Sequence, residues 1–257
     1  MKILVFTEKP FAPAAVKAIE NSINASGNEL EVVEGGTRAD LLEAIRNADG
    51  LIVRSDKIDN DIMDAAPQLK VIVRAGAGYD NIDLEAATKH GICVMNTPGQ
   101  NSNAVAELVF GMIIMMCRNQ YNGKSGTELK DKTLGLYAFG QVGRNVSRIA
   151  KGFGMHVSAL DKFVPDVMME GEGVKPLHSA DELFTENQFV SLHIPATAET
   201  RKSIGYDLVM KMPKNGVLIN TARKEVIDEE GLMKALEERP DLRYVCLLYT
   251  SDAADEL

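Results

Sequence analysis

The stretch Leu134-Gly135-Leu136-Tyr137-Ala138-Phe139-Gly140-Gln141-Val142-Gly143 decides the fold. Its first residues form an apolar run of the length of one buried strand, which leads into a turn that contains glycines. A helix-like segment, Val142–Lys151, follows directly. Because strand, glycine turn and helix in this order are typical of nucleotide-binding α/β domains, we expect a parallel sheet in this half of the chain.

The same alternation of strand and helix continues on both sides of this stretch. Short β-branched runs predict buried parallel strands at Ile3–Phe6, Leu30–Val33, Leu51–Val53, Val71–Val73, Ile92–Met95, Leu134–Ala138, Val157–Leu160, Phe189–His193 and Val217–Asn220. Amphipathic segments predict helices at Ala12–Ala25, Ala39–Asn47, Asn60–Ala66, Leu84–His90, Val142–Lys151, Ala180–Thr185, Tyr206–Met210 and Glu229–Glu238. Gly27 and Gly91 follow two of these helices, where a helix C-terminus favours glycine.

The pattern is interrupted once, by a long apolar helix at Asn103–Arg118 and a polar connector at Asn119–Lys132. We therefore expect an α/β protein of two Rossmann-like or flavodoxin-like domains with parallel sheets, joined by a long interdomain helix. The expected domains are residues 1–98, which would bind the substrate, and residues 99–245, which would bind the nucleotide.

Composition limits the function classes. The net charge of −9 over 257 residues argues against binding to nucleic acid or to anionic membranes. The apolar stretch Ala104–Cys117 contains Glu107 and is shorter than the roughly 20 residues that a bilayer requires. The three cysteines match neither a zinc site nor a disulfide framework, which favours a reducing cytoplasm. No histidine follows metal-ligand spacing, so we expect no metal.

The glycine turn reads Ala138-x-Gly140-x-x-Gly143 against the dinucleotide pattern G-x-G-x-x-G. Gly140 would let the backbone approach a pyrophosphate, and Gly143 would let the helix pack close to the strand. The helix start, with Gln141 and Val142, would offer N–H groups. Ala138 departs from the pattern, and its methyl group is compatible with the turn if its φ is negative. A glycine turn without a ligand is the alternative.

Asp161 supports the nucleotide interpretation because it closes the next expected strand, at the spacing where an acid meets the adenine ribose. A carboxylate there accepts a hydrogen bond from the 2′-hydroxyl and repels a 2′-phosphate. NAD is therefore expected rather than NADP, although the neighbouring Lys162 could accept that phosphate.

Several further motifs occur in one order along the chain. They are Val73-Arg74-Ala75-Gly76-Ala77-Gly78-Tyr79-Asp80-Asn81-Ile82-Asp83, Asn96-Thr97-Pro98, Asn103-Ala104-Val105-Ala106-Glu107, Ser191-Leu192-His193-Ile194-Pro195 and Leu218-Ile219-Asn220-Thr221-Ala222-Arg223. With these motifs, residues 2–245 resemble the D-isomer-specific 2-hydroxy-acid dehydrogenases, and the first motif resembles the substrate loop of the phosphoglycerate dehydrogenase branch.

This resemblance implies a chemistry and a set of residues. The family transfers a hydride between a D-2-hydroxy acid and a nicotinamide, while an Arg holds the substrate carboxylate, a His exchanges the proton and a Glu orients the His. Arg223 matches the catalytic Arg, and its planar guanidinium can grip a carboxylate bidentately. The residues expected to bind the cofactor are Ala77, Gly140, Gln141, Val142, Gly143, Asp161, His193, Ile194, Pro195, Thr221 and Ala222. His193 matches a cofactor contact, not the catalytic His.

The expected substrate carries a phosphate. Arg54 and Arg74 each end a predicted parallel strand, so both can face one ligand, and two cations suit a substrate with a phosphate and a carboxylate. Solvated arginines are the alternative. The residues expected to bind substrate are Arg54, Arg74, Ala75, Gly76, Asn101 and Ser102. The turn at Gly76 would present N–H groups to an anion, whereas Asn101 and Ser102 could simply cap a helix.

The function implied is NAD-dependent oxidation of D-3-phosphoglycerate to 3-phosphohydroxypyruvate, the first step of serine biosynthesis, by a cytoplasmic homodimer. A glyoxylate or hydroxypyruvate reductase of the same family and a non-catalytic NAD-sensing corepressor are alternatives. Two departures from the phosphoglycerate dehydrogenase pattern concern the substrate. Lys224-Glu225 stand where glycines are common after Arg223, and the connector Asn119–Lys132 is short.

The last residues do not continue the family pattern. The family's catalytic Glu and His are expected after the strand that begins near Arg243, and neither motif is present. Residues 246–257 instead resemble the in-frame translation of a sequencing adapter, and we interpret them as an artefactual tail. On this interpretation the nucleotide-binding domain is incomplete, and the chain as given is expected to be inactive.

Overall fold

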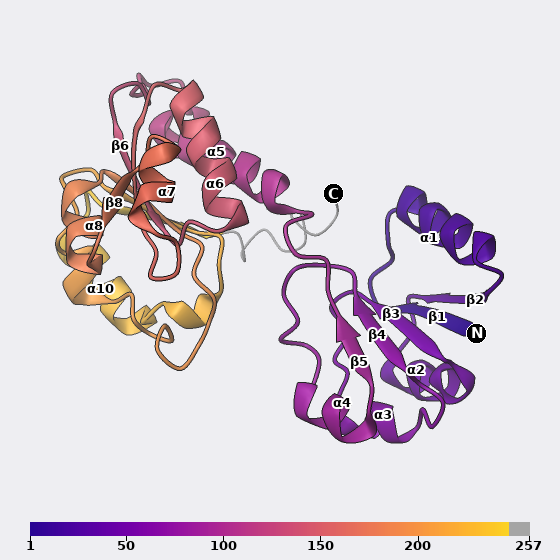
Figure 1. Cartoon of the computed structure of the whole chain (residues 1–257). Helices are drawn as coiled ribbons and strands as arrows, with labels where there is room; N and C mark the ends of the chain where they lie inside the picture. The colour runs from indigo at the N-terminus through magenta and orange to yellow at the C-terminus, as the bar shows by residue number, and fades with distance from the viewer. Residues whose placement is uncertain (247–257) are drawn as a thin grey trace. The chain divides into compact units, whose positions relative to one another are not determined.

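The computed structural model (Figure 1) describes residues 1–246 and divides the chain into two compact units. Unit 1 covers Met1–Asn101, and unit 2 begins at Ser102. Each unit contains a sheet of parallel strands, which confirms the predicted α/β class with two parallel sheets. The interpretation of residues 246–257 as a tail falls outside the described residues except at Cys246.

Unit 1 is a five-stranded sheet with helices between the strands. The strands are β1 (Lys2–Thr7), β2 (Glu29–Glu34), β3 (Gly50–Val53), β4 (Val71–Arg74) and β5 (Cys93–Met95). The helices are α1 (Pro13–Ala25), α2 (Arg38–Ala44), α3 (Asn60–Asp64) and α4 (Leu84–His90), with a 3-10 turn η1 (Ile45–Asn47). The strand order is β2-β1-β3-β4-β5, as in flavodoxin-like sheets. The order reverses between β1 and β3, and open α/β sheets bind ligands outside the carboxyl ends of such strands.

Local sequence signals set the ends of the helices in unit 1. The Asp83 side chain accepts a hydrogen bond from the Ala86 N–H at the start of α4, which satisfies one donor of the first turn. Gly27 and Gly91 both have a φ of +68°, which confirms their predicted places after α1 and α4. The core lies on both faces of the sheet, because Leu4 and Val5, which point to opposite faces of β1, are both fully buried.

Unit 2 is a six-stranded sheet preceded by the long helix α5 (Ser102–Cys117). The strands are β6 (Thr133–Tyr137), β7 (His156–Leu160), β8 (Lys175–Leu177), β9 (Phe189–Leu192), β10 (Val217–Asn220) and β11 (Arg243–Cys246). The other helices are α6 (Gln141–Gly152), α7 (Asp166–Gly171), α8 (Ala180–Glu186), α9 (Tyr206–Val209) and α10 (Glu229–Glu238), with 3-10 turns η2 (Asn119–Tyr121) and η3 (Lys224–Val226).

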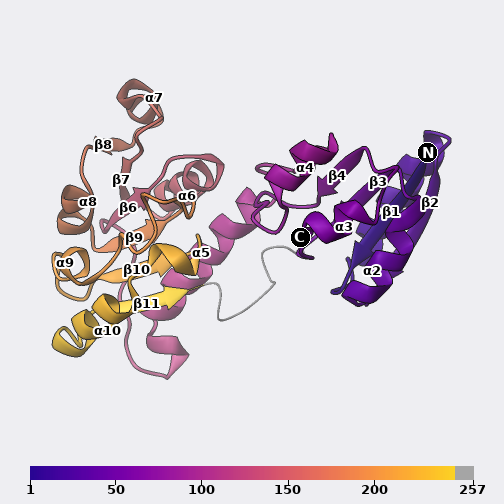
Figure 2. The same cartoon turned by 90° about the horizontal axis from the view of Figure 1, so that it is seen from below.

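The strand order of unit 2 is β11-β10-β9-β6-β7-β8, so the order reverses between β6 and β9. Figure 2 shows β6, β9, β10 and β11 side by side. This is the order of a Rossmann sheet, in which the reversal point is the expected nucleotide site. The backbone joins the two strand ends there, because the His193 N–H donates to Tyr137 O at 2.9 Å.

Helix α5 packs against α6 on one face of this sheet. The rings of Phe110 and Phe153 are stacked, with centroids 5.1 Å apart, and Arg148 Nη2 donates to Asn103 Oδ1 at 2.8 Å. At the other end of α5, Arg243 Nη1 donates to Met116 O at 2.6 Å. That bond satisfies one of the carbonyl groups left open at a helix C-terminus.

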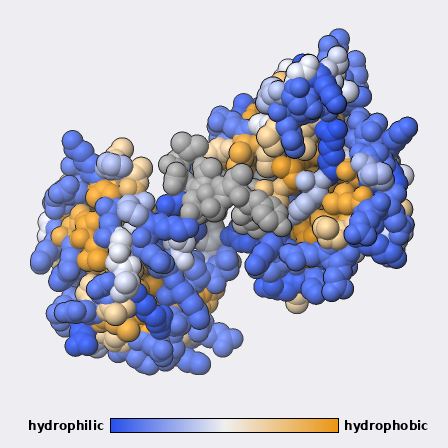
Figure 3. All heavy atoms as spheres, turned by 180° about the vertical axis from the view of Figure 1, so that it is seen from behind, coloured by the Kyte–Doolittle hydropathy of each residue, from blue (hydrophilic) through white to orange (hydrophobic). Residues whose placement is uncertain are grey.

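The surface is that of an ordinary globular protein. Hydrophilic residues dominate the face of each unit that Figure 3 shows, with smaller apolar areas among them. Within residues 1–246, no helix is both long enough and apolar enough to cross a bilayer.

Candidate functional site

The predicted glycine turn connects β6 to α6 in unit 2. The Ala138 N–H donates to Leu160 O at 2.9 Å, which extends the pairing of β6 with β7 by one residue. The next side chain, Phe139, is fully buried and lies under the Arg144 guanidinium, whose carbon is 4.9 Å from the ring centroid. The turn is therefore held by the backbone hydrogen bond of Ala138 and by the buried side chain of Phe139.

The N-terminus of α6 is open to a ligand. Its N-cap residue is Gly140, which has no side chain to accept the first N–H groups of the helix, and these include the N–H groups of Gln141 and Val142. A Cβ placed on Gly140 would meet nothing within 4 Å, whereas one on Gly143 would lie 2.5 Å from Ala138 O. Gly140 thus borders open space and Gly143 sits against backbone. These are the two roles expected from the sequence, and they suit a bound phosphate group.

Ala138 does not have the backbone conformation that the sequence analysis required of it. Its φ is +85°, in the region that favours glycine, where the expected φ was negative. The reason is geometric, because the tight turn at this position needs a left-handed residue whatever side chain occupies it. The Ala138 methyl group is held in a strained conformation that costs about 1–2 kcal/mol.

Replacing Ala138 by glycine should therefore stabilise unit 2. Relief of the left-handed strain outweighs the added freedom of the unfolded chain, so the free energy of unfolding should rise by about 0.5–1 kcal/mol. Ala196, a half-buried loop alanine whose φ is not positive, is the matched control, and Ala196→Gly should lower the same quantity. Urea unfolding measures the free energy of unfolding of both variants, and an Ala138→Gly protein that is less stable than the natural protein would contradict the strain argument.

Asp161 follows β7 and braces the turn. Its Oδ2 accepts from the Phe139 N–H at 2.8 Å, and its Oδ1 accepts from the N–H groups of Phe163 (2.7 Å) and Val164 (3.1 Å). A carboxylate offers about four lone-pair positions, so one remains for a ribose hydroxyl. Lys162 points its ammonium group at Glu199, with which it forms an ion pair.

His193 lies at the carboxyl end of β9, beside the residues that follow β10. The Thr221 hydroxyl donates to Leu192 O at 3.3 Å, so it accepts from His193 Nδ1–H across 3.0 Å. This leaves Nε2 as an unprotonated acceptor, and that atom is buried with no hydrogen-bond partner among the described residues. Burial lowers the pKa of His193 to about 3. The imidazole is therefore neutral at physiological pH.

The other residues predicted around this strand end lie in the two loops that follow β9 and β10. Ile194 is buried and Pro195 is exposed, while Ala222 and Arg223 are half-buried. Arg223 Nη1 approaches Ala222 O at 3.4 Å. The carboxyl ends of β6, β7, β9 and β10 share one edge of the sheet, so the structure brings the predicted cofactor residues of unit 2 and Arg223 to one edge.

Asn220 is a residue of this site that sequence reasoning missed. It ends β10 fully buried, its Oδ1 accepts from the Ala222 N–H at 2.9 Å, and its Nδ2 donates to Arg223 O at 3.2 Å. Nδ2 also lies 3.3 Å from the Tyr244 hydroxyl. Its amide therefore shapes the turn that carries Arg223. The available signal was a polar amide at the end of an otherwise apolar strand.

In unit 1, Arg54 directly follows β3 and Arg74 is the last residue of β4. Both are buried, with only 4% and 7% of their surfaces exposed, so the alternative of solvated arginines is wrong. Arg54 Nη2 has no hydrogen-bond partner among the described residues. Because an uncompensated buried cation is costly, this atom suits an anionic ligand.

The turn after β4 is built around Arg74. A Cβ on Gly76 would lie 1.0 Å from Arg74 Nη1, so only glycine leaves room for the guanidinium. The N–H groups of Ala75 and Gly76 donate to Val53 O (2.8 Å) and Arg74 O (2.9 Å), and they are not available to a substrate anion. Ala77 O accepts from Asn96 Nδ2 at 2.7 Å. Ala75 and Gly76 therefore contribute backbone shape rather than the N–H donors expected from the sequence.

The last predicted residues lie where the two units are divided. Asn101 is half-buried at the end of unit 1. Ser102 is buried in the first turn of α5, and its Oγ accepts from Asn145 Nδ2 of α6 at 3.1 Å. The structure thus gives Ser102 a role in joining α5 to α6. Among the described residues, no group of three or more His, Cys, Asp or Glu could hold a metal ion.

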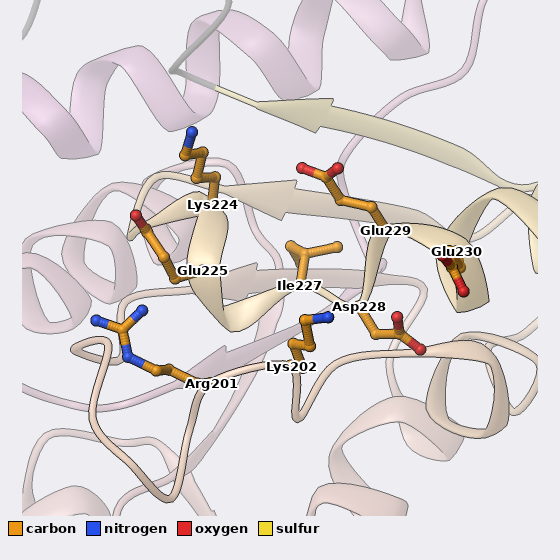
Figure 4. Close-up of a pocket in the computed structure, with 8 residues that line it drawn as sticks. All are labelled: Arg201, Lys202, Lys224, Glu225, Ile227, Asp228, Glu229 and Glu230. Atoms are coloured by element: carbon orange, nitrogen blue, oxygen red, sulfur yellow. The ribbon is translucent and has the colours of Figure 1, made fainter.

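A pocket of about 520 Å³ lies in unit 2, beside the segment that follows the carboxyl end of β10 (Figure 4). Its residues come from the loop before α9 and from the segment that runs from the end of β10 into the first turn of α10. The bridge between Ile204 and Ile227 joins the two segments. Its lining residues are Arg201, Lys202, Lys224, Glu225, Ile227, Asp228, Glu229 and Glu230. Because cations and carboxylates are mixed there, the pocket favours no ligand of a single charge.

Comparison with known proteins identifies a family with a similar sequence. Residues 3–253 match the profile of the family described as D-isomer specific 2-hydroxyacid dehydrogenase, catalytic domain. A D-3-phosphoglycerate dehydrogenase from Methanocaldococcus jannaschii is 40% identical over 93% of this chain and 47% of its own length. A glyoxylate reductase from Thermococcus litoralis is 34% identical over 93% of this chain and 77% of its own length.

A solved structure shows the same architecture. The NAD+-bound 3-phosphoglycerate dehydrogenase of Entamoeba histolytica has 47% sequence identity and a TM-score of 0.89, covering 100% of this chain and 85% of that one. The chain spans about half the length of the Methanocaldococcus jannaschii relative. On the profile match and these identities, the chain belongs to the D-isomer specific 2-hydroxyacid dehydrogenase family.

Proposed function

We propose that the full-length protein oxidises D-3-phosphoglycerate to 3-phosphohydroxypyruvate with NAD+, as the first step of serine biosynthesis. The observation that carries this proposal is the pair of buried arginines, Arg54 and Arg74, at adjacent strand ends of unit 1. Among the described residues, Arg54 Nη2 is buried without a hydrogen-bond partner. A phosphate group would supply a negative charge to pair with this guanidinium and oxygen atoms to accept its hydrogen bonds.

The residues of unit 2 fit NAD. The open N-terminus of α6 would hold the pyrophosphate, with Gly140 leaving space for it, and Asp161 has one lone-pair position left for the adenine ribose. A carboxylate at Asp161 disfavours a 2′-phosphate, and Lys162 is engaged by Glu199. Bound NAD would supply the hydride acceptor. His193, Ile194, Pro195, Thr221, Ala222 and, from unit 1, Ala77 are proposed to contact it.

Arg223 is proposed to grip the substrate carboxylate. Asn220 fixes the backbone of the turn that carries Arg223 through two hydrogen bonds, so this backbone need not be ordered when the substrate binds. Ala75, Gly76, Asn101 and Ser102 are proposed to shape the rest of the substrate site. Residues 1–98 would then form the substrate-binding domain, and residues 99–245 the NAD-binding domain.

A single set of rate measurements tests the substrate and the cofactor together. D-3-phosphoglycerate and D-glycerate are each supplied to the full-length protein with NAD+ or with NADP+. The rate of nucleotide reduction is followed by the absorbance of the reduced nicotinamide at about 340 nm. We expect the phosphorylated acid with NAD+ to give the highest kcat/KM, by about a hundredfold or more over each other pair, as for one to two charge-assisted bonds.

The same measurements separate the alternative function. The 39% identity to a hydroxypyruvate reductase of Thermotoga maritima favours an unphosphorylated substrate as the second candidate. Equal kcat/KM for the two acids would support that candidate and reject the phosphate assignment. We also propose a cytoplasmic homodimer, in keeping with the unpaired cysteines and with the family resemblance. Sedimentation velocity would test the dimer, which a monomer at micromolar concentration would contradict.

A further inference from the structure

The segment that carries Arg54 is held by a residue of a different loop. Asn81 Nδ2 donates to Asp56 O at 2.7 Å and approaches Arg54 O at 3.4 Å. An amide nitrogen has two hydrogens, so these contacts use the whole donor capacity of the side chain. Asn81 belongs to the loop between β4 and α4, whereas Arg54 and Asp56 follow β3.

The backbone on either side of Asn81 reinforces this contact. The Ile58 N–H donates to Asn81 O, and the Asp83 N–H donates to Ile58 O, both at 2.9 Å. These bonds form a short parallel bridge between Ile58 and Ile82, and both isoleucine side chains are buried. Backbone and side-chain hydrogen bonds therefore join the two loops around Asn81.

A third loop holds the same segment from the other side. The Glu8 N–H, just after β1, donates to Asp56 Oδ1 at 2.7 Å. The Arg54–Asp56 segment is thus fixed between the loops that follow β1 and β4, at the reversal point of the sheet. Its one long cationic side chain is buried and ends in an unpartnered Nη2 among the described residues.

We infer that Asn81 is a positioning residue that sets the Arg54 guanidinium for the phosphate of the substrate. The inference rests on the proposed function and adds a residue that does not touch the ligand. Loss of the Asn81 amide frees the backbone carbonyls of Arg54 and Asp56, so Arg54 must be ordered again each time the phosphate binds. A substrate without a phosphate does not depend on that ordering.

The test is a double-mutant cycle on binding. The dissociation constants of D-3-phosphoglycerate and D-glycerate are measured by calorimetry on the full-length protein with NADH present, a combination that cannot react. Asn81→Ala should weaken D-3-phosphoglycerate about tenfold and D-glycerate less than about twofold, as for one lost hydrogen bond. Arg54→Gln should weaken D-3-phosphoglycerate at least as much, and the double variant should match Arg54→Gln alone.

Controls separate positioning from general damage. Asn24→Ala, at an exposed position of α1, should leave both constants unchanged. Asn81→Ser keeps a hydroxyl donor in the loop and should fall between the natural protein and Asn81→Ala, which also provides a variant if the alanine protein does not fold. Equal weakening of both ligands, or multiplicative effects in the double variant, would reduce Asn81 to a structural role and overturn the inference.

The two proposals fail in different ways. If Arg54→Gln leaves D-3-phosphoglycerate binding unchanged, the phosphate assignment itself is wrong and the role of Asn81 falls with it. If Arg54→Gln weakens that ligand but Asn81→Ala does not, only the positioning inference is wrong.

Discussion

Replacement of Gly143 by alanine is expected to abolish useful binding of NAD+ and to destabilise unit 2. The added Cβ would lie 2.5 Å from Ala138 O and 3.3 Å from Ala138 C, both backbone atoms that cannot rotate away. Helix α6 must therefore move off the turn. Overpacking of this kind costs about 1–3 kcal/mol of stability. The displaced helix start would also lose about two charge-assisted bonds to the pyrophosphate, which corresponds to a hundredfold or greater loss of affinity.

Two glycines of the same region serve as controls. A Cβ on Gly140 or on Gly152 would meet nothing within 4 Å, and neither residue has a positive φ. Gly140→Ala should keep the stability of unit 2 but weaken NAD+, because its methyl group occupies the space proposed for the pyrophosphate. Gly152→Ala, at the far end of α6, should change neither. Calorimetric titration with NAD+ and thermal unfolding measure both, and a Gly143→Ala protein that binds NAD+ normally would refute the proposed site.

Much of the fold could be predicted from the sequence because hydrophobic periodicity reports burial directly. Strands buried on both faces, such as β1 and β9, appear as short apolar runs, and the glycines that end α1 and α4 mark the helix boundaries. Strand β8 and helix α7 were missed. β8 is three residues long, contains Pro176 and lies at the sheet edge, so it shows neither an apolar run nor an alternation.

The candidate site likewise contains residues whose position could be predicted from the sequence and residues whose role could not. Arg54, Arg74 and Asp161 were predictable because a charged residue at the end of an apolar strand has few places to go other than the functional edge of a parallel sheet. The conformation of Ala138 and the roles of Asn81 and Asn220 were not predictable. They depend on φ and on hydrogen bonds between loops that are far apart in sequence, and neither leaves a periodic trace.

The 257 residues alone are predicted to show no turnover, and the reason lies in the placement of the histidines. Oxidation of a hydroxy acid needs a base for the hydroxyl proton, and an effective base has a pKa near the working pH. The sequence has four histidines. His90 ends α4 and His156 begins β7, so each lies near the amino end of a strand, opposite the functional edge of its sheet. His178 follows the carboxyl end of β8, but it is exposed at the edge of the sheet, two strands away from β6 and on the side opposite β9.

His193 is the histidine that lies at the reversal point of the unit 2 sheet, and its pKa of about 3 makes it a poor base at neutral pH. Its Nδ1–H is held by Thr221, so the ring cannot turn without breaking that bond. General acid–base catalysis is typically worth about 10²–10⁴-fold, and kcat should be lower by at least that factor than in an enzyme whose active site contains a histidine base.

The experiment compares two proteins with the same first 245 residues. One is the 257-residue chain, and the other continues from Val245 with the corresponding segment of the Methanocaldococcus jannaschii relative. NADH formation from D-3-phosphoglycerate is measured for each, and NAD+ binding is measured beside it to show that the nucleotide site of the shorter protein is folded. If the shorter protein binds NAD+ and turns over within tenfold of the longer one, His193 or another group within the 257 residues takes the proton, and the assignment of the active-site base is wrong.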